Sequence, residues 1–452
     1  SLHKTITRPA QAGGMNPLHQ HPVLAKLAGI LVLAVALTLP LRLITGLLEE
    51  RASRRDAAVA EITETWGRAQ QITGPFLVVP YRDDLLANRV PARLAVFLPE
   101  TLRVEGQLDP VRRHRGIYEA VVYSAALTLS GRFAPPDPAA LGLPRERLAW
   151  DRAYLALGVD DLRGARSALT VRWAGRELPL EPGARHDLLP GGVHAALPAL
   201  DPAAPGPLEF ALALDLNGSG RLAFAPVGAA TEVSLRSAWT DPGFTGAILP
   251  AERTLNDAGF EATWRASYYG REYPRQWTSE IASPARDHLA RSAFGVELVN
   301  LVDAYRVVER ATKYGLLFFV LIFAAFFLFE VLAALRLHAF HYILVGAALV
   351  LFYLALLSVS EFARFGVAYL VAASASTVLI ALYSVSILRS GARSLVVTGA
   401  LGAIYGFLFF VLRMQDYSLL AGTAALFAVL ALTMYLTRKI DWHREAVAAE
   451  AE

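Results

Sequence analysis

The chain has 452 residues, of which 54% are hydrophobic, and its mean hydropathy is +0.39. This composition is typical of a protein with both membrane-spanning and globular parts, and a net charge of only +3 argues against a nucleic-acid partner. The absence of cysteine excludes thiolate nucleophiles, disulfides and cysteine-based metal sites.

The first apolar segment, residues 27–48, predicts a membrane-spanning helix. Residues 1–14 are polar and precede Met15, which fits a non-native extension, and they take no part in the fold prediction. A cleaved signal peptide is the alternative interpretation of the apolar segment. However, the segment is longer than a signal-peptide core and no small-x-small site follows it, so the sequence favours an uncleaved signal anchor.

The polar region 49–314 predicts a large soluble domain. Residues 50–71 continue as a helix with one apolar stripe, and we expect Gly74-Pro75 to end it. Asn217-Gly218-Ser219-Gly220 predicts a hairpin turn, and residues 305–314 predict a helix that leads into the second span. Short alternating segments between turn residues predict strands over 77–79, 93–98, 118–129, 168–173, 210–216, 221–224, 232–239, 261–268 and 294–302. Such a pattern favours an antiparallel β-sandwich or two packed sheets.

Five more apolar segments follow, over residues 315–335, 343–359, 366–388, 395–412 and 419–436. Within a bilayer the backbone must bond to itself, so these segments are predicted as helices. The predicted fold class is an α-helical membrane bundle of six spans, arranged as one plus five. A large β-rich, antiparallel, sandwich-like domain is inserted after the first span.

The short loops predict the orientation. Basic residues gather on one side, at Arg336, Arg389, Arg393, Arg438, Lys439 and Arg444, whereas the opposite loops hold only Arg364 and Arg413. The positive-inside rule places the first group in the cytoplasm, so the soluble domain lies in the periplasm of a bacterial inner membrane. The predicted parts are a cytoplasmic N-terminus (1–26), the first helix (27–48), the periplasmic domain with helical linkers at both ends (49–314), the five-helix bundle (315–436) and a cytoplasmic tail (437–452).

No enzyme motif, cofactor site or metal site is predicted from the sequence. Asp83-Asp84 and Asp160-Asp161 are interpreted as turn residues that bond their own backbone rather than as catalytic pairs. His338 and His341 are interpreted as an interfacial pair. The histidines of the soluble domain lack metal-ligand spacing and are predicted to lie at the surface; they are His114, His186, His194 and His288.

Glu330 is the candidate functional residue, because a carboxylate on an aromatic-rich membrane helix is costly unless it is paired or faces a cavity. Two interpretations stay open. Glu330 is an interfacial carboxylate paired with Arg336 or Arg389, or it is a proton or ligand site inside the bundle.

Three glycines, Gly399, Gly402 and Gly406, give the fifth span a smooth face for close helix packing. We expect this packing within the bundle, with dimerisation as the alternative.

Several short motifs occur in the order and spacing of a known family; they are Glu50-Arg51, Trp66-Gly67, Gly74-Pro-Phe-Leu-Val-Val-Pro-Tyr81, Arg115-Gly-Ile-Tyr118, Ser237-Ala-Trp239, Gly259-Phe260 with Trp264, Arg310-Ala-Thr-Lys-Tyr314, Phe327-Leu-Phe-Glu330, Arg336-Leu-His338, Tyr342-Ile-Leu-Val-Gly346, Leu351-Phe-Tyr-Leu354, Ser358-Val-Ser-Glu361 and Ile440-Asp-Trp442. With these motifs, the chain beyond Met15 resembles the CreD family of inner-membrane proteins. Ala339 and Phe362 depart from the proline and histidine usual at those positions. The departures weaken any required role for the nearby histidines.

The resemblance implies one helix, an external domain and a helical bundle. It also implies expression under the Cre two-component system and a role in envelope maintenance and stress response, and it supplies no catalytic residues.

The leading hypothesis is a non-enzymatic envelope-integrity protein whose periplasmic domain binds an envelope component or a periplasmic protein. Besides the lipid bilayer, no further partner is identified from the sequence, and the oligomeric state is left open. The first alternative is a transporter or lipid-handling protein that uses the bundle with Glu330. The second is an envelope hydrolase, which requires a catalytic cluster that the sequence does not display.

Overall fold

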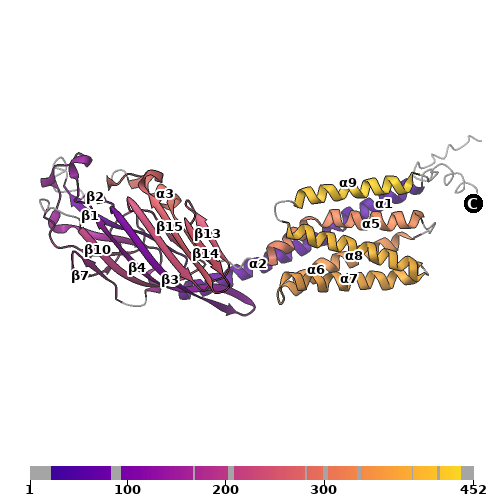
Figure 1. The fold of residues 1–452 in the computed structure, drawn as a ribbon. Coiled ribbons are helices and arrows are strands. Elements are labelled where there is room, and N and C mark those ends of the chain that lie inside the picture. The colour runs from indigo at the N-terminus through magenta and orange to yellow at the C-terminus, as the bar shows by residue number, and fades with distance from the viewer. Residues whose placement is uncertain are drawn as a thin grey trace, which may run out of the picture. The chain divides into compact units, whose positions relative to one another are not determined.

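The computed structural model describes residues 22–82, 93–165, 168–201, 208–279, 282–298, 304–332, 337–388, 390–414 and 418–438. The chain divides into two compact units (Figure 1). The helical unit comprises Ser1–Ser53 and Val302–Glu452, and the β unit comprises Arg54–Leu301.

The β unit contains two large sheets. Within the described residues, one sheet has nine strands: β13 (Pro242–Gly246), β17 (Phe294–Leu298), β11 (Arg221–Phe224), β1 (Gln70–Tyr81), β5 (Tyr154–Val159), β9 (Val193–Ala196) and β8 (Glu181–Pro182) in order, with β2 (Arg93–Phe97) on β1 and β16 (Gln276–Thr278) on β2. The other sheet has eight described strands in the order β14 (Glu252–Asn256), β15 (Gly259–Ser267), β12 (Ala230–Ser237), β3 (Thr101–Arg115), β4 (Tyr118–Phe133), β10 (Leu208–Ser219), β6 (Thr170–Trp173) and β7 (Arg176–Pro179). A helix, α3 (Ala282–Ser292), precedes β17.

Both sheets contribute to one hydrophobic core. Burial alternates along β12, as expected for a strand with one face on the core, whereas every residue of β1 beyond Gln71 is buried. Phe76 of β1 packs edge-on against Trp277, and Trp264 of β15 packs against Phe294. Most strand pairs are antiparallel as predicted, but β1–β11 and β3–β12 are parallel.

Two local predictions are wrong. The helix before the sheet ends at Trp66 rather than at Gly74-Pro75, and β1 runs through Gly74-Pro75 with a register shift against β5. Asn217–Gly220 is not a hairpin turn, because β10 and β11 lie in different sheets. At this crossing, a Cβ on Gly218 would lie 2.4 Å from the Tyr123 hydroxyl, so a side chain does not fit.

The helical unit consists of α1 (Pro22–Ala36), the first part of α2 (Thr38–Trp66), α4 (Ala304–Lys313), α5 (Gly315–Leu332), α6 (Ala339–Ser360), α7 (Phe365–Leu388), α8 (Gly391–Arg413) and α9 (Ser418–Thr437). Among the described residues, four helices are long and apolar enough to cross a membrane, or five if α4 and α5, bent by 52°, form one span. The segment Leu420–Tyr435 of α9 is apolar but shorter. These helices agree with a multi-pass bundle, and the sixth span stays a prediction.

Candidate functional site

The candidate site of the helical unit is the carboxylate of Glu330 near the end of α5. This residue is only 6% exposed. Its Oε2 accepts a hydrogen bond from the Tyr342 hydroxyl of α6 at 2.8 Å, and its Oε1 accepts one from the Leu337 backbone N–H at 2.9 Å. The ammonium group of Lys26, on α1, forms an ion pair with Oε1. Three helices therefore meet at one buried carboxylate.

Lys26 is itself held in place. Its Nζ donates to the Leu337 carbonyl at 2.7 Å and lies 5.9 Å from the centre of the Tyr342 ring. A buried ion pair is tolerated in an apolar environment when its remaining polar atoms are also bonded, and this pair meets that condition. The arrangement fits a link between α1 and the α5–α6 connection better than an open site.

The space beside this cluster is small. The adjoining cavity has a volume of about 10 Å³, close to the space that one water molecule needs; it is lined by Phe326, Leu337, His341, Tyr342, Val345, Ser384 and Ile387. A transported solute or lipid headgroup does not fit in such a space. His341 Nδ1 bonds to the Tyr383 hydroxyl at 2.8 Å, and His338 Nδ1 accepts from the Phe340 N–H at 3.3 Å, so the two histidines have different partners.

Arg336 and Arg389, the predicted partners of Glu330, lie outside the described residues, and their pairing stays a prediction. The predicted partners did not include Lys26 or Tyr342. One signal in the sequence pointed to Lys26, because the predicted orientation places both the start of the first span and the end of the second span at the cytoplasmic side.

A second ion pair links the opposite ends of two membrane helices. Arg51 Nη1 of α2 lies 3.7 Å from Glu361 Oε1, directly after α6. Lys26 lies near the start of α1 and Leu337 just before α6, whereas Arg51 follows the first predicted span and Glu361 follows α6. One set of contacts joins the start of α1 to the start of α6, and the other joins α2 beyond the first span to the end of α6. This is the pairing expected when successive spans cross the membrane in alternating directions.

The glycines of α8 are placed differently from the prediction. Gly399, Gly402 and Gly406 are exposed, and a Cβ built on any of them meets no described atom within 4 Å. The expected packing of this face inside the bundle is therefore wrong for the part of the chain that the structure describes. α8 instead packs through larger side chains such as Leu401, Tyr405 and Leu408, which are buried.

The carboxylates of the β unit have structural partners. Asp161 Oδ1 accepts from the Arg163 N–H at 3.0 Å, which confirms the predicted backbone-bonded turn. The Arg163 side chain also bonds both carboxylate oxygens, and Asp161 Oδ2 accepts from the Arg68 N–H at 3.0 Å. Asp83 and Asp84 lie outside the described residues.

The hydrogen bonds from Arg163 are the main reason why the pKa of Asp161 falls to about 2, although burial acts in the opposite direction. Asp161 is therefore ionised at neutral pH. Its hydrogen bond with the Arg68 N–H holds the start of β1 next to the end of β5. A general acid needs a proton at that pH, so this carboxylate does not serve as one.

Two predictions of surface histidines are wrong. His186 and His194 are 7% and 2% exposed. His186 packs edge-on against Phe76, its Nδ1 accepts from the Leu188 N–H at 3.1 Å, and burial lowers its pKa. His194 Nδ1 bonds to the Gly183 carbonyl at 2.6 Å. An aromatic ring beside each imidazole, Phe76 for His186 and Tyr154 for His194, and a backbone partner for each Nδ1 allow both histidines to lie inside the unit.

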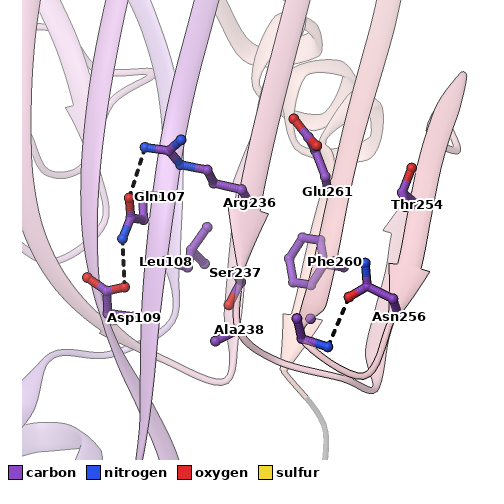
Figure 2. A pocket seen from close by; sticks show the side chains of 12 residues that line it. Gln107, Leu108, Asp109, Arg236, Ser237, Ala238, Thr254, Asn256, Phe260 and Glu261 are labelled. Carbon is purple, nitrogen blue, oxygen red and sulfur yellow. Dashed lines mark hydrogen bonds between the residues drawn. The ribbon is translucent and has the colours of Figure 1, made fainter.

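A groove lies on the eight-stranded sheet, beside the middle of β3 and at the ends of β12, β14 and β15 (Figure 2). Its volume is about 420 Å³. Arg236 Nη2 donates to Gln107 Oε1 and Gln107 Nε2 donates to Asp109 Oδ1, both at 3.0 Å. The second carboxylate of the groove, Glu261, lies on β15, two strands from β3 and therefore about 10 Å or more from Asp109. The groove is polar, but its carboxylates do not converge as a catalytic pair does.

Within the described residues, no group of three or more His, Asp or Glu side chains is arranged to hold a metal ion. The fold and the site together define a multi-pass membrane protein with a two-sheet β unit inserted after its first helix.

Comparison with known proteins agrees with this class. The family model described as inner membrane protein CreD matches residues 22–443. The inner membrane protein CreD of Escherichia coli strain K12 is 32% identical over 429 residues, which cover 93% of this chain and 94% of that protein. The chain belongs to the CreD family of inner membrane proteins.

Among solved structures, an M1 zinc metallopeptidase from Deinococcus radiodurans aligns with a TM-score of 0.19 and 13% identity, over 37% of this chain and 38% of that one. A likeness this low carries no argument about fold or activity.

Proposed function

We propose that this protein maintains the integrity of the bacterial cell envelope through its β unit, which lies in the periplasm and acts without catalysing a reaction. The observation that carries the proposal is the insertion of a fully cored two-sheet unit between the first and second membrane segments. Both ends of that unit continue into membrane helices, so it stays close to the bilayer, where it binds an envelope component or a periplasmic protein.

The distribution of charge supports the periplasmic location. Basic residues cluster in the loops that share a side with Lys26 and Leu337, whereas the loop after α6 carries Glu361 and a single arginine, Arg364. By the positive-inside rule, the side of Lys26 is cytoplasmic. The β unit follows α2 at the opposite side, together with Arg51 and Glu361.

The geometry of the carboxylates supports a role without catalysis. The buried Asp161 is committed to Arg163, and the groove carboxylates Asp109 and Glu261 lie too far apart to share a reacting atom. An envelope hydrolase, the third hypothesis, gains no support from these residues.

A chimera tests the proposal. The helices from α5 to α9 are replaced by an unrelated membrane anchor, and dye entry into a deletion strain is measured under envelope stress. We expect the tethered β unit to restore the barrier to the level that the intact chain gives. Failure of a folded, normally expressed chimera would contradict the proposal, and a chain that retains the helices but lacks the β unit is the matched control.

The alternative is a transporter or lipid-handling protein that uses the bundle, and the burial of Glu330 is the observation in its favour. The ion pair with Lys26 and the small adjoining cavity count against it. If the β unit is the working part, Glu330→Gln leaves rescue of the deletion strain unchanged. Loss of rescue at normal protein levels would instead favour the alternative.

A further inference from the structure

The β3–β4 hairpin extends beyond its sheet. β3 and β4 pair up to Arg115↔Tyr118, whereas β12 pairs with β3 only as far as Leu108 and β10 pairs with β4 only as far as Val122. The outermost pairs therefore have no described strand on either side. A two-stranded ribbon is only marginally stable alone, so it needs support from another element.

Helix α2 supplies this support (Figure 1). The Arg113 guanidinium lies 4.7 Å from the centre of the Trp66 ring, Arg115 forms an ion pair with Glu61, and the Trp66 Nε1–H donates to the Tyr123 carbonyl at 3.1 Å. Residues closer to the tip contact residues nearer the N-terminus of α2. Within the β unit, the end of the hairpin therefore lies beside Glu61, and the residues before it lie beside Trp66.

The tip is basic and partly apolar. Arg112, Arg113, His114 and Arg115 are consecutive, and the acidic side chains that contact them are Glu119 and Glu61. The side chains of Arg112, His114 and Arg115 remain 55%, 60% and 57% exposed, and the flanking Val111 and Ile117 are each 45% exposed. Exposed arginines beside exposed apolar side chains are the composition of a surface that contacts anionic lipid.

The length of α2 limits the distance to the membrane. Glu61 follows Leu48, the end of the predicted span, by thirteen residues, which at 1.5 Å per residue separates them by at most about 20 Å. The headgroup layer occupies roughly 5–7 Å of that distance. Because Arg115 contacts Glu61, the hairpin tip is held beside a part of α2 that lies, along the helix, within about 20 Å of the end of the predicted span.

We propose that the tip of the β3–β4 hairpin, residues 111–117, binds the anionic phospholipid headgroups of the membrane that the helices span. Phosphate and carboxylate groups of the lipids accept hydrogen bonds from the exposed guanidinium groups, and Ile117 contacts the interfacial region. The inference rests on α2 entering the membrane and does not depend on the proposed envelope function.

The lack of cysteine allows a direct test in the full chain. Ile117→Cys is labelled with an environment-sensitive fluorophore, and the protein is placed in nanodiscs that contain phospholipid with a quencher on the headgroup. The control, Arg176→Cys, lies at the start of β7, directly after the β6–β7 turn. Trp173, just before this turn, and Gly131, near the end of β4, both pair with Phe210 of β10. The turn therefore lies beside the end of β4 that is far from the hairpin tip, roughly 40 Å away along the strand.

We expect quenching at position 117 to exceed quenching at position 176 several-fold in discs of anionic phosphatidylglycerol. We also expect it to fall several-fold in pure phosphatidylcholine or at high salt, because the attraction is electrostatic. Equal quenching at the two positions would overturn the proposal, and so would equal quenching at position 117 in both lipids. The His114→Glu variant adds a negative charge at a residue that pairs with Glu119 of β4, and it is expected to reduce the signal while Trp fluorescence stays unchanged.

Discussion

Glu330 owes its place inside the helical unit to the groups that bond its carboxylate, and these groups come from different parts of the chain. Lys26 is 304 positions away in sequence, whereas Tyr342 and the Leu337 N–H follow within one connection. The sequence identifies Glu330 as unusual, because hydrophobic residues surround it. The partner that neutralises it depends on which helices pack together, which no local pattern reports.

The ion pair predicts an asymmetry between single and double variants. Lys26→Met leaves the Glu330 carboxylate buried without its cation, so we expect a loss of about 3 kcal/mol in the free energy of unfolding of the helical unit. The double variant Lys26→Met/Glu330→Gln should recover most of this loss, because neither side chain then carries a buried charge. Denaturation of the full chain in mixed micelles, followed by helical circular dichroism, measures both. A double variant less stable than the single one would contradict the structural role.

Asp161 predicts a pH dependence in the β unit. Its pKa is about 2 in the folded chain and 3.8 without the fold, so between these two pH values the folded chain binds fewer protons at this group than the unfolded chain does. The carboxylate therefore contributes roughly 2 kcal/mol of stability at neutral pH, and this contribution is lost as the pH falls from about 4 through about 2.

The measurement uses tryptophan fluorescence during urea unfolding, because six of the seven tryptophans lie in the β unit. Asp161→Asn should lower stability at pH 7 and remove this part of the acid dependence. Asp257→Asn, in an exposed turn, is the control. If the two variants respond to acid alike, the role assigned to Asp161 is wrong.

At the scale of elements, the alternation of side chains predicted several strands closely. The prediction of β11 agrees with the structure at both ends, and β12 and β15 differ from theirs by about two residues. Each has one buried face, which produces the period of two. β1 was only partly predicted, because it is buried on both faces and its apolar run crosses Gly74-Pro75. β10 and β11 belong to different sheets, although the glycine-rich sequence between them is typical of a hairpin turn. Tertiary packing decides this change of sheet, so the local sequence does not predict it.

The end of α2 depends on Gly67 rather than on the later glycine and proline. Gly67 has φ of +145°, and a Cβ there would lie 2.6 Å from the Asn217 carbonyl oxygen. Gly67→Ala therefore forces backbone to move at the junction of helix and sheet, and we expect it to cost more than 2 kcal/mol of stability.

Gly116→Ala is the matched control for Gly67→Ala. Gly116 also has a positive φ, but a Cβ there meets no described atom within 4 Å. It should cost only about 1 kcal/mol. Urea unfolding of both variants separates the clash from the backbone preference, and equal losses would contradict this account of Gly67.

For the whole molecule, composition and hydropathy predicted the combination of membrane helices and a β-rich domain, and the family match agrees with an inner-membrane protein. The segments after residue 314 are easily found because apolar runs long enough to cross a bilayer are rare in soluble proteins. The glycine face of α8 shows the limit of such patterns. Small residues predict that helices can approach closely, but not which helix does so.

The location of the β unit is the claim on which the proposed function depends, and cysteine labelling tests it most directly because the native chain has no cysteine. Intact cells carrying Asp257→Cys, Phe362→Cys or Ala339→Cys are treated with a membrane-impermeant maleimide that passes the outer membrane. Positions 257 and 362 should react in intact cells, and position 339 should react only after the inner membrane is opened. Labelling of position 339 in intact cells, with protection of position 257, would place the β unit in the cytoplasm and contradict its role in the envelope.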